Sequence, residues 1–187
     1  YFIRLGRFIA DSMGYTWRDV VYAPMPMFHI NPLGYGVVAG LTAGASVFGT
    51  RRFSPGDFWG TVKCIGATAA VLHGTPLKML LKDSTPQDSA GHSLRCVFFA
   101  SEEFLSRFSV PMGITLYGST EAGWVTILRP DEQIERLGSV GREWAGSGAI
   151  KLLDGDGNEV PDGDVGELHS RTAYVFDGYW KNPDKTA

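Results

Sequence analysis

The sequence predicts an α/β protein: a parallel sheet with helices on both faces, followed by a small antiparallel β segment. Apolar runs of strand length alternate with helix-like stretches over the first two-thirds of the 187 residues. These runs are apolar throughout, as expected for parallel strands that helices bury on both sides. After about residue 130 the runs become shorter and alternate polar with apolar residues. Asp, Gly and Asn separate them, which is typical of antiparallel hairpins.

The first part of the chain contains two predicted strands and two predicted helices. The segment RDVVYAPM predicts a buried strand at Val20–Ala23, and ASVFGT predicts a second strand. Between them, PLGYGVVAGLTAG predicts a helix whose small residues let it pack close to the sheet. SPGDFWGTVKCIG predicts the next helix, because Ser54 is a candidate N-cap, Pro55 lies in the first turn, and Asp57 is placed to complete a capping box.

The same alternation continues up to the second predicted domain. TAAVLHG, LRCVFFA and MGITLY predict strands, whereas PLKMLLK and SEEFLSRF predict helices, the latter with Ser101 as its N-cap. Two short alternating strands follow at Ala149–Leu153 and 166–171. We therefore predict an α/β subdomain at 1–130 and the start of an antiparallel β subdomain at 131–187, with the boundary near residues 129–135.

Composition excludes several functional classes. The chain is 44% hydrophobic and 20% charged, with a net charge of −3, which disfavours a nucleic-acid-binding surface. The longest apolar stretch, GVVAGLTAGASVFG, is shorter than the roughly 20 residues of a membrane-spanning helix. Arginines inside the apolar part of the first 13 residues argue against a signal peptide. These features predict a soluble, cytoplasmic protein with no membrane span.

The cysteines and histidines do not form a recognisable metal motif. Cys64 and Cys96 lack CxxC spacing, so we interpret them as buried thiols in a reducing compartment. The histidines lie far apart in the sequence at positions His29, His73, His92 and His169. His29 follows a predicted strand and could face a ligand, although a lone histidine is more often structural. The chain begins at a tyrosine rather than a methionine, and we expect it to be part of a longer protein.

The segment YGSTEAG, residues 117–123, is the strongest local candidate for a site. It follows the predicted strand MGITLY, and parallel sheets bind ligands beyond the carboxyl ends of their strands. Tyr117 offers a flat face, Ser119 and Thr120 offer hydroxyl groups for phosphate oxygens, and Glu121 offers hard oxygen ligands to Mg²⁺. The pattern indicates either a phosphate-and-metal site or a polar loop in which Thr120 caps a helix.

Two other motifs are weaker. GYGVVAG matches the dinucleotide fingerprint GxGxxA only loosely, since it does not directly follow a strand, and close packing of the helix is the better interpretation. DGDGNEVPDGD resembles a calcium-binding loop. However, Glu159 occupies the sixth position, where glycine is needed, and Val165 the twelfth, where glutamate is needed. We therefore predict a hairpin turn there.

Three stretches, taken together, resemble the adenylate-forming superfamily of acyl-CoA synthetases, firefly luciferase and adenylation domains. They are APMPMFHINPLG, LYGSTEAG, and the C-terminal stretch from GSVGREWAG to DGYWKNPDKTA, and they occur in that order. The acyl-CoA ligase branch is the most similar, with crotonobetaine/carnitine-CoA ligases as the suggested type. The resemblance implies a reaction in which a carboxylate and ATP form an acyl-adenylate, from which coenzyme A then displaces AMP.

The resemblance also implies roles for particular residues. Catalytic roles fall to Thr120, which would bind a phosphate oxygen, and to Glu121, which would bind Mg²⁺, while Tyr117 would pack on the adenine. The remaining nucleotide-binding positions are Gly118, Ser119, Ser101 and Glu102. The acyl pocket would be lined by His29, Gly74, Thr75 and Gly118. Glycine at position 118 leaves room for a substrate larger than acetate.

The sequence departs from the family pattern at one contact and lacks other parts of it. The family often has Gly-Gly-Ala or Gly-Glu-Pro beside the adenine, whereas ASEE stands at residues 100–103 here. By resemblance, the phosphate loop would precede Tyr1, and the ribose-binding aspartate and catalytic lysine would follow Ala187. We therefore expect an internal fragment that has little activity alone and self-associates through exposed sheet edges. The alternatives are an amino-acid-activating domain and a non-catalytic module that binds a nucleotide or a partner.

Overall fold

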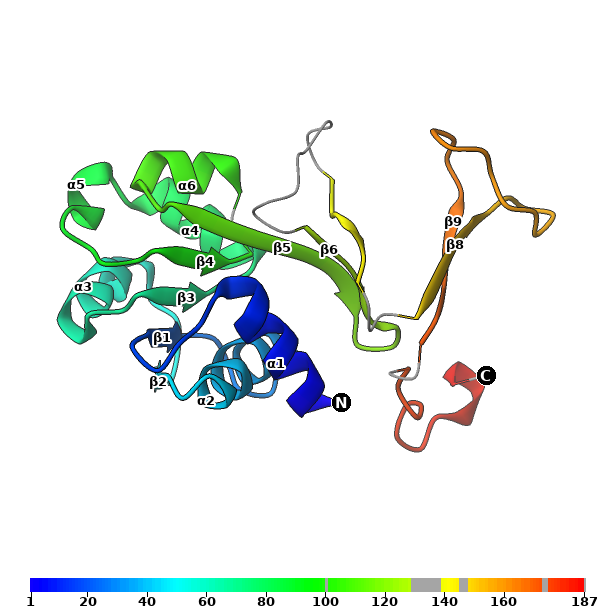
Figure 1. Cartoon of the computed structure of the whole chain (residues 1–187), viewed down its shortest axis with the longest axis horizontal. Coiled ribbons are helices and arrows are strands. Elements are labelled where there is room, and N and C mark those ends of the chain that lie inside the picture. The colour runs from blue at the N-terminus through cyan, green and yellow to red at the C-terminus, as the bar shows by residue number, and fades with distance from the viewer. Residues whose placement is uncertain (100, 129–138, 145–147, 173–174, 187) are drawn as a thin grey trace. The chain divides into compact units, whose positions relative to one another are not determined.

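The computed structural model describes residues 1–99, 101–128, 139–144, 148–172 and 175–186 (Figure 1). It contains two compact units. Among the described residues, the first unit comprises Tyr1–Thr115, and the second comprises Leu116–Leu128 and the residues from 139 onward.

The first unit is built on a parallel sheet. Its strands are β1 (Val20–Ala23), β2 (Ser46–Gly49), β3 (Ala69–Val71), β4 (Cys96–Phe98) and the start of β5 (Met112–Ser119). They lie in the order β2-β1-β3-β4-β5, and every neighbouring pair is parallel. Ala69, for example, pairs with Val21 on one side and with Cys96 on the other. The predicted parallel sheet is therefore confirmed, and β1 has the bounds expected from the sequence.

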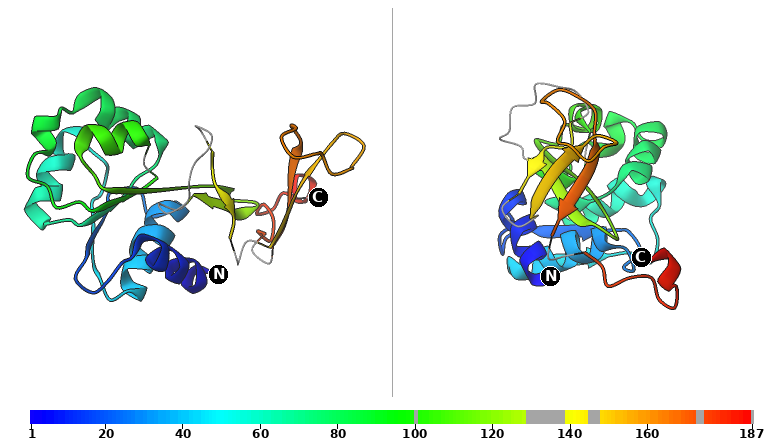
Figure 2. Two further views of the ribbon diagram at one scale, coloured as in Figure 1. Left: turned by 45° about the horizontal axis from the view of Figure 1, so that its top comes forward. Right: turned by 90° about the vertical axis from the view of Figure 1, so that its right-hand side faces the viewer.

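Helices cover both faces of this sheet, as predicted (Figure 2, left). One face carries α1 (Phe2–Met13), the π-helix η1 (Asn31–Val38) and α2 (Ala39–Thr42). The other carries α3 (Pro55–Ile65), α4 (Gly74–Asp83), α5 (Pro86–Ser89) and α6 (Glu102–Phe108). The second face holds an aromatic cluster in which the Trp59 ring lies 4.9 Å from that of Phe108, which in turn lies 4.9 Å from Phe104.

The small residues of η1 and α2 allow close packing on the sheet. A Cβ atom on Gly36 would lie 2.8 Å from the Ala23 Cβ, and one on Gly40 would lie 2.6 Å from Val47 Cγ2. Real Cβ atoms do not approach so closely without a shift of the backbone. These contacts confirm that the glycines of GYGVVAG serve helix packing, and the predicted helix consists of the π-helix η1 followed by α2.

Three details of the first unit differ from expectation. Ser54 and Pro55 do begin α3, but the Ser54 side chain makes no capping hydrogen bond, so the capping box with Asp57 is wrong. A capping box instead begins α5, where Thr85 accepts from the Asp88 N–H and Asp88 accepts from the Thr85 N–H. Cys96 is buried as expected, whereas Cys64 is exposed because it lies on the solvent side of α3.

Ser109 at the end of α6 gives a direct test of backbone strain. It has φ 56° and ψ 39°, a left-handed conformation that glycine adopts more easily than any residue with a Cβ. Replacing Ser109 by glycine should therefore raise the free energy of unfolding by about 0.5–1 kcal/mol. The matched control, Ser106→Gly inside the same helix, should lower it by about 0.5–1 kcal/mol. Urea denaturation of the two variants measures both changes, and equal signs would contradict the strain.

The second unit is mainly antiparallel. It contains the end of β5, β6 (Gly123–Leu128), β7 (Arg142–Glu143), β8 (Ala149–Leu153), β9 (Glu167–Arg171) and a short 3-10 helix η2 (Pro183–Lys185). β8 and β9 form the predicted antiparallel pair, with Lys151 opposite His169. The predicted hairpin turn is also present, since Asp154 Oδ1 accepts from the Asp156 and Asn158 N–H groups at 2.9 Å each.

Candidate functional site

The candidate segment YGSTEAG forms the end of β5 and the turn that leads into β6. Thr120, Glu121 and Ala122 connect the two strands, which are neighbours in the sheet. No helix begins at Thr120, so the alternative in which Thr120 caps a helix is wrong. The Tyr117 side chain is 48% exposed and Ser119 and Thr120 are also exposed, so the turn presents its aromatic ring and hydroxyl groups to solvent.

Glu121 is held by a segment that lies far away in the sequence. The Tyr179 hydroxyl donates to Glu121 Oε1 at 2.5 Å, and the Phe176 N–H donates to the Glu121 carbonyl oxygen at 3.1 Å. On the other side, the Ser119 hydroxyl oxygen accepts from the Ala122 N–H at 3.0 Å and so closes the turn. Both the backbone and the carboxylate of Glu121 therefore have fixed partners within the second unit.

These contacts favour the ionised form of Glu121. The Tyr179 hydroxyl is the main cause that lowers the pKa of the Glu121 carboxyl, supported by the Glu121 N–H and by Ser119. The same hydrogen bond raises the pKa of Tyr179, so the phenol stays protonated and keeps donating. At neutral pH the turn therefore presents a carboxylate anion that is oriented by hydrogen-bond donors.

Close packing within the hairpin explains why residue 118 is a glycine. A Cβ atom at this position would collide with the Gly123 carbonyl oxygen and would lie 3.2 Å from the Trp124 Cα. The backbone of β6 thus approaches too closely for any side chain. The glycine therefore does not by itself indicate a roomy acyl pocket, and that role stays a prediction.

The turn fits a magnesium-bound phosphate better than a metal ion bound by protein groups alone. Among the residues that the structure describes, no group of three or more His, Cys, Asp or Glu side chains could hold a metal ion. Mg²⁺ does not need such a cluster, because it often binds one or two carboxylates and completes its shell with water and substrate phosphates. Glu121, with two exposed hydroxyl residues directly before it, provides that kind of partial shell.

The first unit brings other predicted residues to the carboxyl edge of its sheet. His29 follows β1, His73, Gly74 and Thr75 follow β3, and Ser101 and Glu102 follow β4. The carboxyl ends of parallel strands share one edge, which is where ligands bind in open α/β sheets. The residues predicted from the sequence therefore lie at the sheet edge where the topology also predicts a ligand site. The predicted residues of the turn, Tyr117–Glu121, belong to the second unit.

Two loops of this edge are tied together by Asn31. Its buried side-chain amide donates to the Leu72 carbonyl oxygen at 2.8 Å, and its N–H donates to His29 Nδ1 at 3.1 Å. The His29 and His73 rings lie 5.8 Å apart as a result. Burial, and then the proximity of His29, lower the pKa of His73, so this ring is mainly neutral at neutral pH. Asn31 was not predicted from the sequence, because its partner is 41 residues away.

The loop after β4 contains a strained residue. Phe99 has φ 64°, a left-handed conformation that is uncommon for a residue with a bulky side chain. Its N–H donates to the Ile114 carbonyl oxygen at 2.5 Å, which fixes the loop against β5. Ser101 is confirmed as the N-cap of α6, since its hydroxyl accepts from the Phe104 N–H at 3.2 Å. Glu102 is exposed in the first turn of the same helix.

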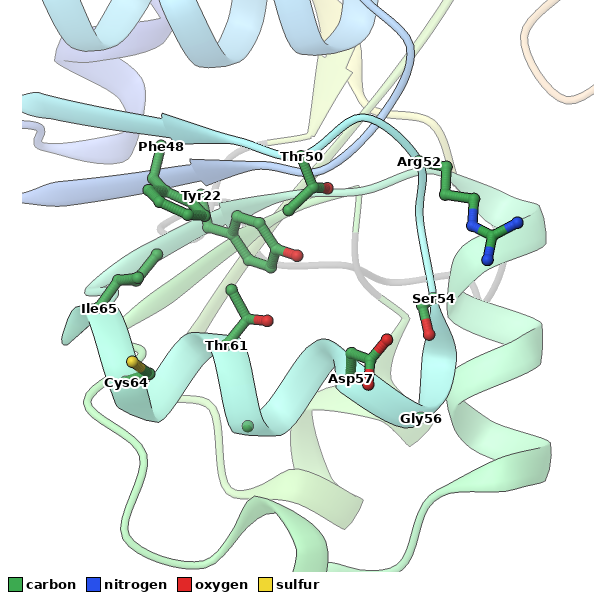
Figure 3. Close-up of a pocket in the computed structure, with 11 residues that line it drawn as sticks. Tyr22, Phe48, Thr50, Arg52, Ser54, Gly56, Asp57, Thr61, Cys64 and Ile65 are labelled. Carbon is green, nitrogen blue, oxygen red and sulfur yellow. The ribbon is translucent and has the colours of Figure 1, made fainter.

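A surface pocket of about 560 Å³ lies elsewhere in the first unit, between β2 and α3 (Figure 3). None of the predicted site residues lines it. Figure 3 shows the Tyr22 hydroxyl directed towards Thr50 and Thr61. Burial raises the pKa of Tyr22, and hydrogen bonds with these two threonines partly offset the effect. The polar groups at its centre thus bind one another, and the pocket adds nothing to the candidate site.

The fold and the turn together define an α/β protein that presents an exposed aromatic ring, two hydroxyl groups and a carboxylate after a sheet strand. The chain belongs to the family of AMP-binding enzymes, whose model matches residues 3–180. This match confirms the resemblance to adenylate-forming enzymes that the motifs indicated. None of the helices in the described part of the chain has the length and apolar character needed to cross a membrane.

CoA ligases are among the proteins that are similar to this chain. The chain is 35% identical to the sulfoacetate–CoA ligase of Cupriavidus necator over 177 residues, which cover 90% of the chain and 34% of that protein. It is 32% identical over 187 residues to the medium/long-chain-fatty-acid–CoA ligase FadD17 of Mycobacterium marinum, which covers 96% of the chain and 36% of that protein. The chain therefore spans about a third of the length of these curated relatives.

The fold is also found in solved structures. An ATP-bound RpMatB-BxBclM chimera, B3, superposes with a TM-score of 0.76 at 25% sequence identity. The similarity covers 97% of the present chain and 37% of the chimera. The mixed sheet, largely parallel and followed by a small antiparallel pair, is thus the arrangement of the large domain of adenylate-forming enzymes.

Proposed function

We propose that the chain forms part of an ATP-dependent acyl-CoA synthetase. In the first half-reaction, a carboxylate oxygen of the acid attacks the α-phosphorus of ATP and expels pyrophosphate, which gives an acyl-adenylate. In the second, the sulfur of coenzyme A attacks the acyl carbon, loses its proton and expels AMP. The observation that carries this proposal is the exposed turn Tyr117–Glu121 in a chain whose family and named relatives are AMP-binding enzymes and CoA ligases.

The turn supports specific roles for its residues. The half-exposed Tyr117 ring would stack on the adenine, and the hydroxyl groups of Ser119 and Thr120 would bind phosphate oxygens. Glu121 would bind Mg²⁺, which neutralises negative charge on the phosphates as they react. The chain's own contribution to this step is therefore positioning and charge stabilisation, and no covalent intermediate with the protein is needed.

The residues at the carboxyl edge of the first unit would serve the nucleotide and the acid. Ser101 and Glu102 would lie beside the adenine, and His29, Gly74 and Thr75 would line the acyl pocket. The His29 and His73 rings lie 5.8 Å apart at this edge, and the lowered pKa of His73 keeps that ring neutral. The acid itself is not assigned, since the two named relatives carry names that specify very different acids.

Several wider properties belong to the same proposal. The partners would be a small carboxylic acid, ATP and coenzyme A, with no nucleic acid, and the compartment would be the cytoplasm. The division at residue 130 and the assignment to the crotonobetaine/carnitine type stay predictions. Self-association of the isolated chain through its sheet edges also stays a prediction, which light scattering over a range of protein concentrations would test.

Hydroxylamine trapping tests the proposed reaction. The complete protein that carries these residues is incubated with ATP, Mg²⁺, hydroxylamine and a panel of short-chain, medium-chain, aromatic and sulfonated acids. We expect ATP-dependent hydroxamate formation with at least one acid, and none when ATP or Mg²⁺ is omitted. The 187-residue chain alone should form far less. The absence of both hydroxamate formation and ATP–pyrophosphate exchange across the panel would overturn the proposal.

A further inference from the structure

The carboxylate of Glu121 is the only predicted metal ligand, and its environment comes largely from the C-terminal segment 175–186. Tyr179 Oη and Glu121 Oε1 are 2.5 Å apart although the residues are 58 positions apart in the sequence. A second, independent contact joins the same segments, since the Phe176 N–H donates to the Glu121 carbonyl oxygen at 3.1 Å. One segment therefore holds both the main chain and the side chain of Glu121.

Tyr179 is itself held in place by its own segment. Its N–H donates to Thr186 Oγ1 at 2.9 Å, and the Thr186 hydroxyl donates to the Asn182 carbonyl oxygen at 2.8 Å. The Tyr179 ring meets the Phe176 ring edge to face, with centroids 4.9 Å apart and an interplanar angle of 76°. The side chain is 42% exposed, yet its backbone and its ring both have partners. The phenol oxygen is therefore a fixed donor.

We propose that Tyr179 is a positioning residue that orients the Glu121 carboxylate for the magnesium-bound nucleotide. This inference rests on the proposed function, in which Glu121 binds Mg²⁺. A glutamate on an exposed turn would otherwise sample several rotamers, and ordering it costs free energy when the ligand binds. Donors behind a metal ligand remove much of this cost, and they leave room for the ion because a carboxylate has about four lone-pair sites.

Three changes in the complete protein test this role. Tyr179→Phe removes only the hydroxyl and keeps the ring against Phe176. The control, Trp180→Phe, changes the neighbouring aromatic, which is 88% exposed and stacks with Lys181 rather than reaching Glu121. Thr186→Val removes the acceptor of the Tyr179 N–H and leaves Glu121 unchanged. It serves as a second test if Tyr179→Phe unfolds the segment. Circular dichroism establishes that each variant is folded.

Mn²⁺, as a paramagnetic substitute for Mg²⁺, gives a readout that does not depend on turnover. Electron paramagnetic resonance measures the affinity of each variant for Mn²⁺ in the presence of ATP and without acid. We expect Tyr179→Phe to bind Mn²⁺ about 10-fold more weakly than the wild type, the usual loss when a partner of a metal ligand is removed. Thr186→Val should show a smaller loss, and Trp180→Phe should bind Mn²⁺ as the wild type does.

A double-mutant cycle separates positioning from a general structural effect. If Tyr179 acts through Glu121, then Glu121→Gln combined with Tyr179→Phe should bind Mn²⁺ no more weakly than Glu121→Gln alone. Wild-type affinity in Tyr179→Phe, tighter binding, or a full additive loss in the double variant would each overturn the inference. Hydroxamate formation by the wild type reports on the proposed function separately, so the two failures are distinguishable.

Discussion

Replacing Glu121 by glutamine in the complete protein should slow acyl-adenylate formation by about 10²-fold or more. Glutamine has the same shape and can still accept a hydrogen bond from Tyr179, so the turn should keep its conformation. What is lost is the negative charge that would hold Mg²⁺ on the phosphates. This charge interaction strengthens as the α-phosphorus is attacked, so its loss should fall mainly on the rate rather than on the binding of the acid.

The measurement is ATP–pyrophosphate exchange at several Mg²⁺ concentrations. The defect of Glu121→Gln should be largest at limiting Mg²⁺ and should shrink partly as Mg²⁺ is raised. Glu167→Gln, which removes an exposed carboxylate from β9 in the same unit, should change the rate less than about twofold. Equal rates for the wild type and Glu121→Gln at limiting Mg²⁺ would contradict a metal-binding role for this residue.

The parallel sheet could be predicted because each of its strands is recognisable from its own short apolar run. Val20–Ala23 is apolar along its whole length since helices cover both faces, whereas Ala149–Leu153 is exposed or half-buried at every position. The strand β6 was missed although GWVTIL is rich in aromatic and β-branched residues. The preceding YGSTEAG indicates either a phosphate-and-metal site or a polar loop that caps a helix, and neither interpretation predicts a strand directly after it.

Helices were harder to predict where tertiary packing decides their form. PLGYGVVAGLTAG has the small residues of a helix that lies close to a sheet, and Gly36 and Gly40 do lie there. Its first part is a π-helix, a form that the sequence pattern does not encode. Ser54 looked like a capping residue by type and position, yet its side chain does not cap α3.

The candidate site also contains residues that the local sequence predicts and partners that it does not predict. Tyr117, Ser119, Thr120 and Glu121 lie within five consecutive residues, so residue type and the strand before them are sufficient to predict them as site residues. Tyr179 donates a hydrogen bond to Glu121 although the two residues are 58 positions apart, and no sequence motif around position 179 predicts that contact. Phe99 is similar, because neither its left-handed backbone nor its hydrogen bond to Ile114 can be predicted from its residue type. Long-range partners therefore need the structure.

Replacing Asp19 by alanine should lower the free energy of unfolding of the first unit by about 3 kcal/mol. Asp19 is only 4% exposed and lies just before β1. Its carboxylate accepts from Arg95 Nε and Nη2 at 2.8 Å each, from Thr68 Oγ1 at 2.7 Å and from the Thr16 N–H at 2.7 Å. Removal of the carboxylate would leave these donors unpaired, and a partly buried guanidinium without a partner is costly.

The guanidinium of Arg95 extends the same network to α1. It also donates to the Met13 and Gly14 carbonyl oxygens, at 3.0 and 2.7 Å, and so joins the end of α1 to the start of β1 and β4. Asp19→Asn should cost less than Asp19→Ala, since its amide oxygen can still accept one of these bonds. Asp83→Asn, an exposed aspartate at the end of α4, should change the unfolding free energy by less than about 0.5 kcal/mol.

The pH dependence gives the second half of this test. Burial raises the pKa of the Asp19 carboxyl, but hydrogen bonds from Arg95, Thr68 and Thr16 outweigh burial, and the folded-state pKa lies below the ordinary value. A carboxyl whose pKa is lowered on folding stabilises the protein fully above its unfolded pKa, about 3.9, and less as the pH falls below it. The difference in unfolding free energy between wild type and Asp19→Asn should therefore be constant above about pH 5 and shrink below pH 4. Urea denaturation at stepped pH measures it, and a difference as large at pH 3 as at pH 6 would show that the ionised carboxylate is not what holds α1, β1 and β4 together.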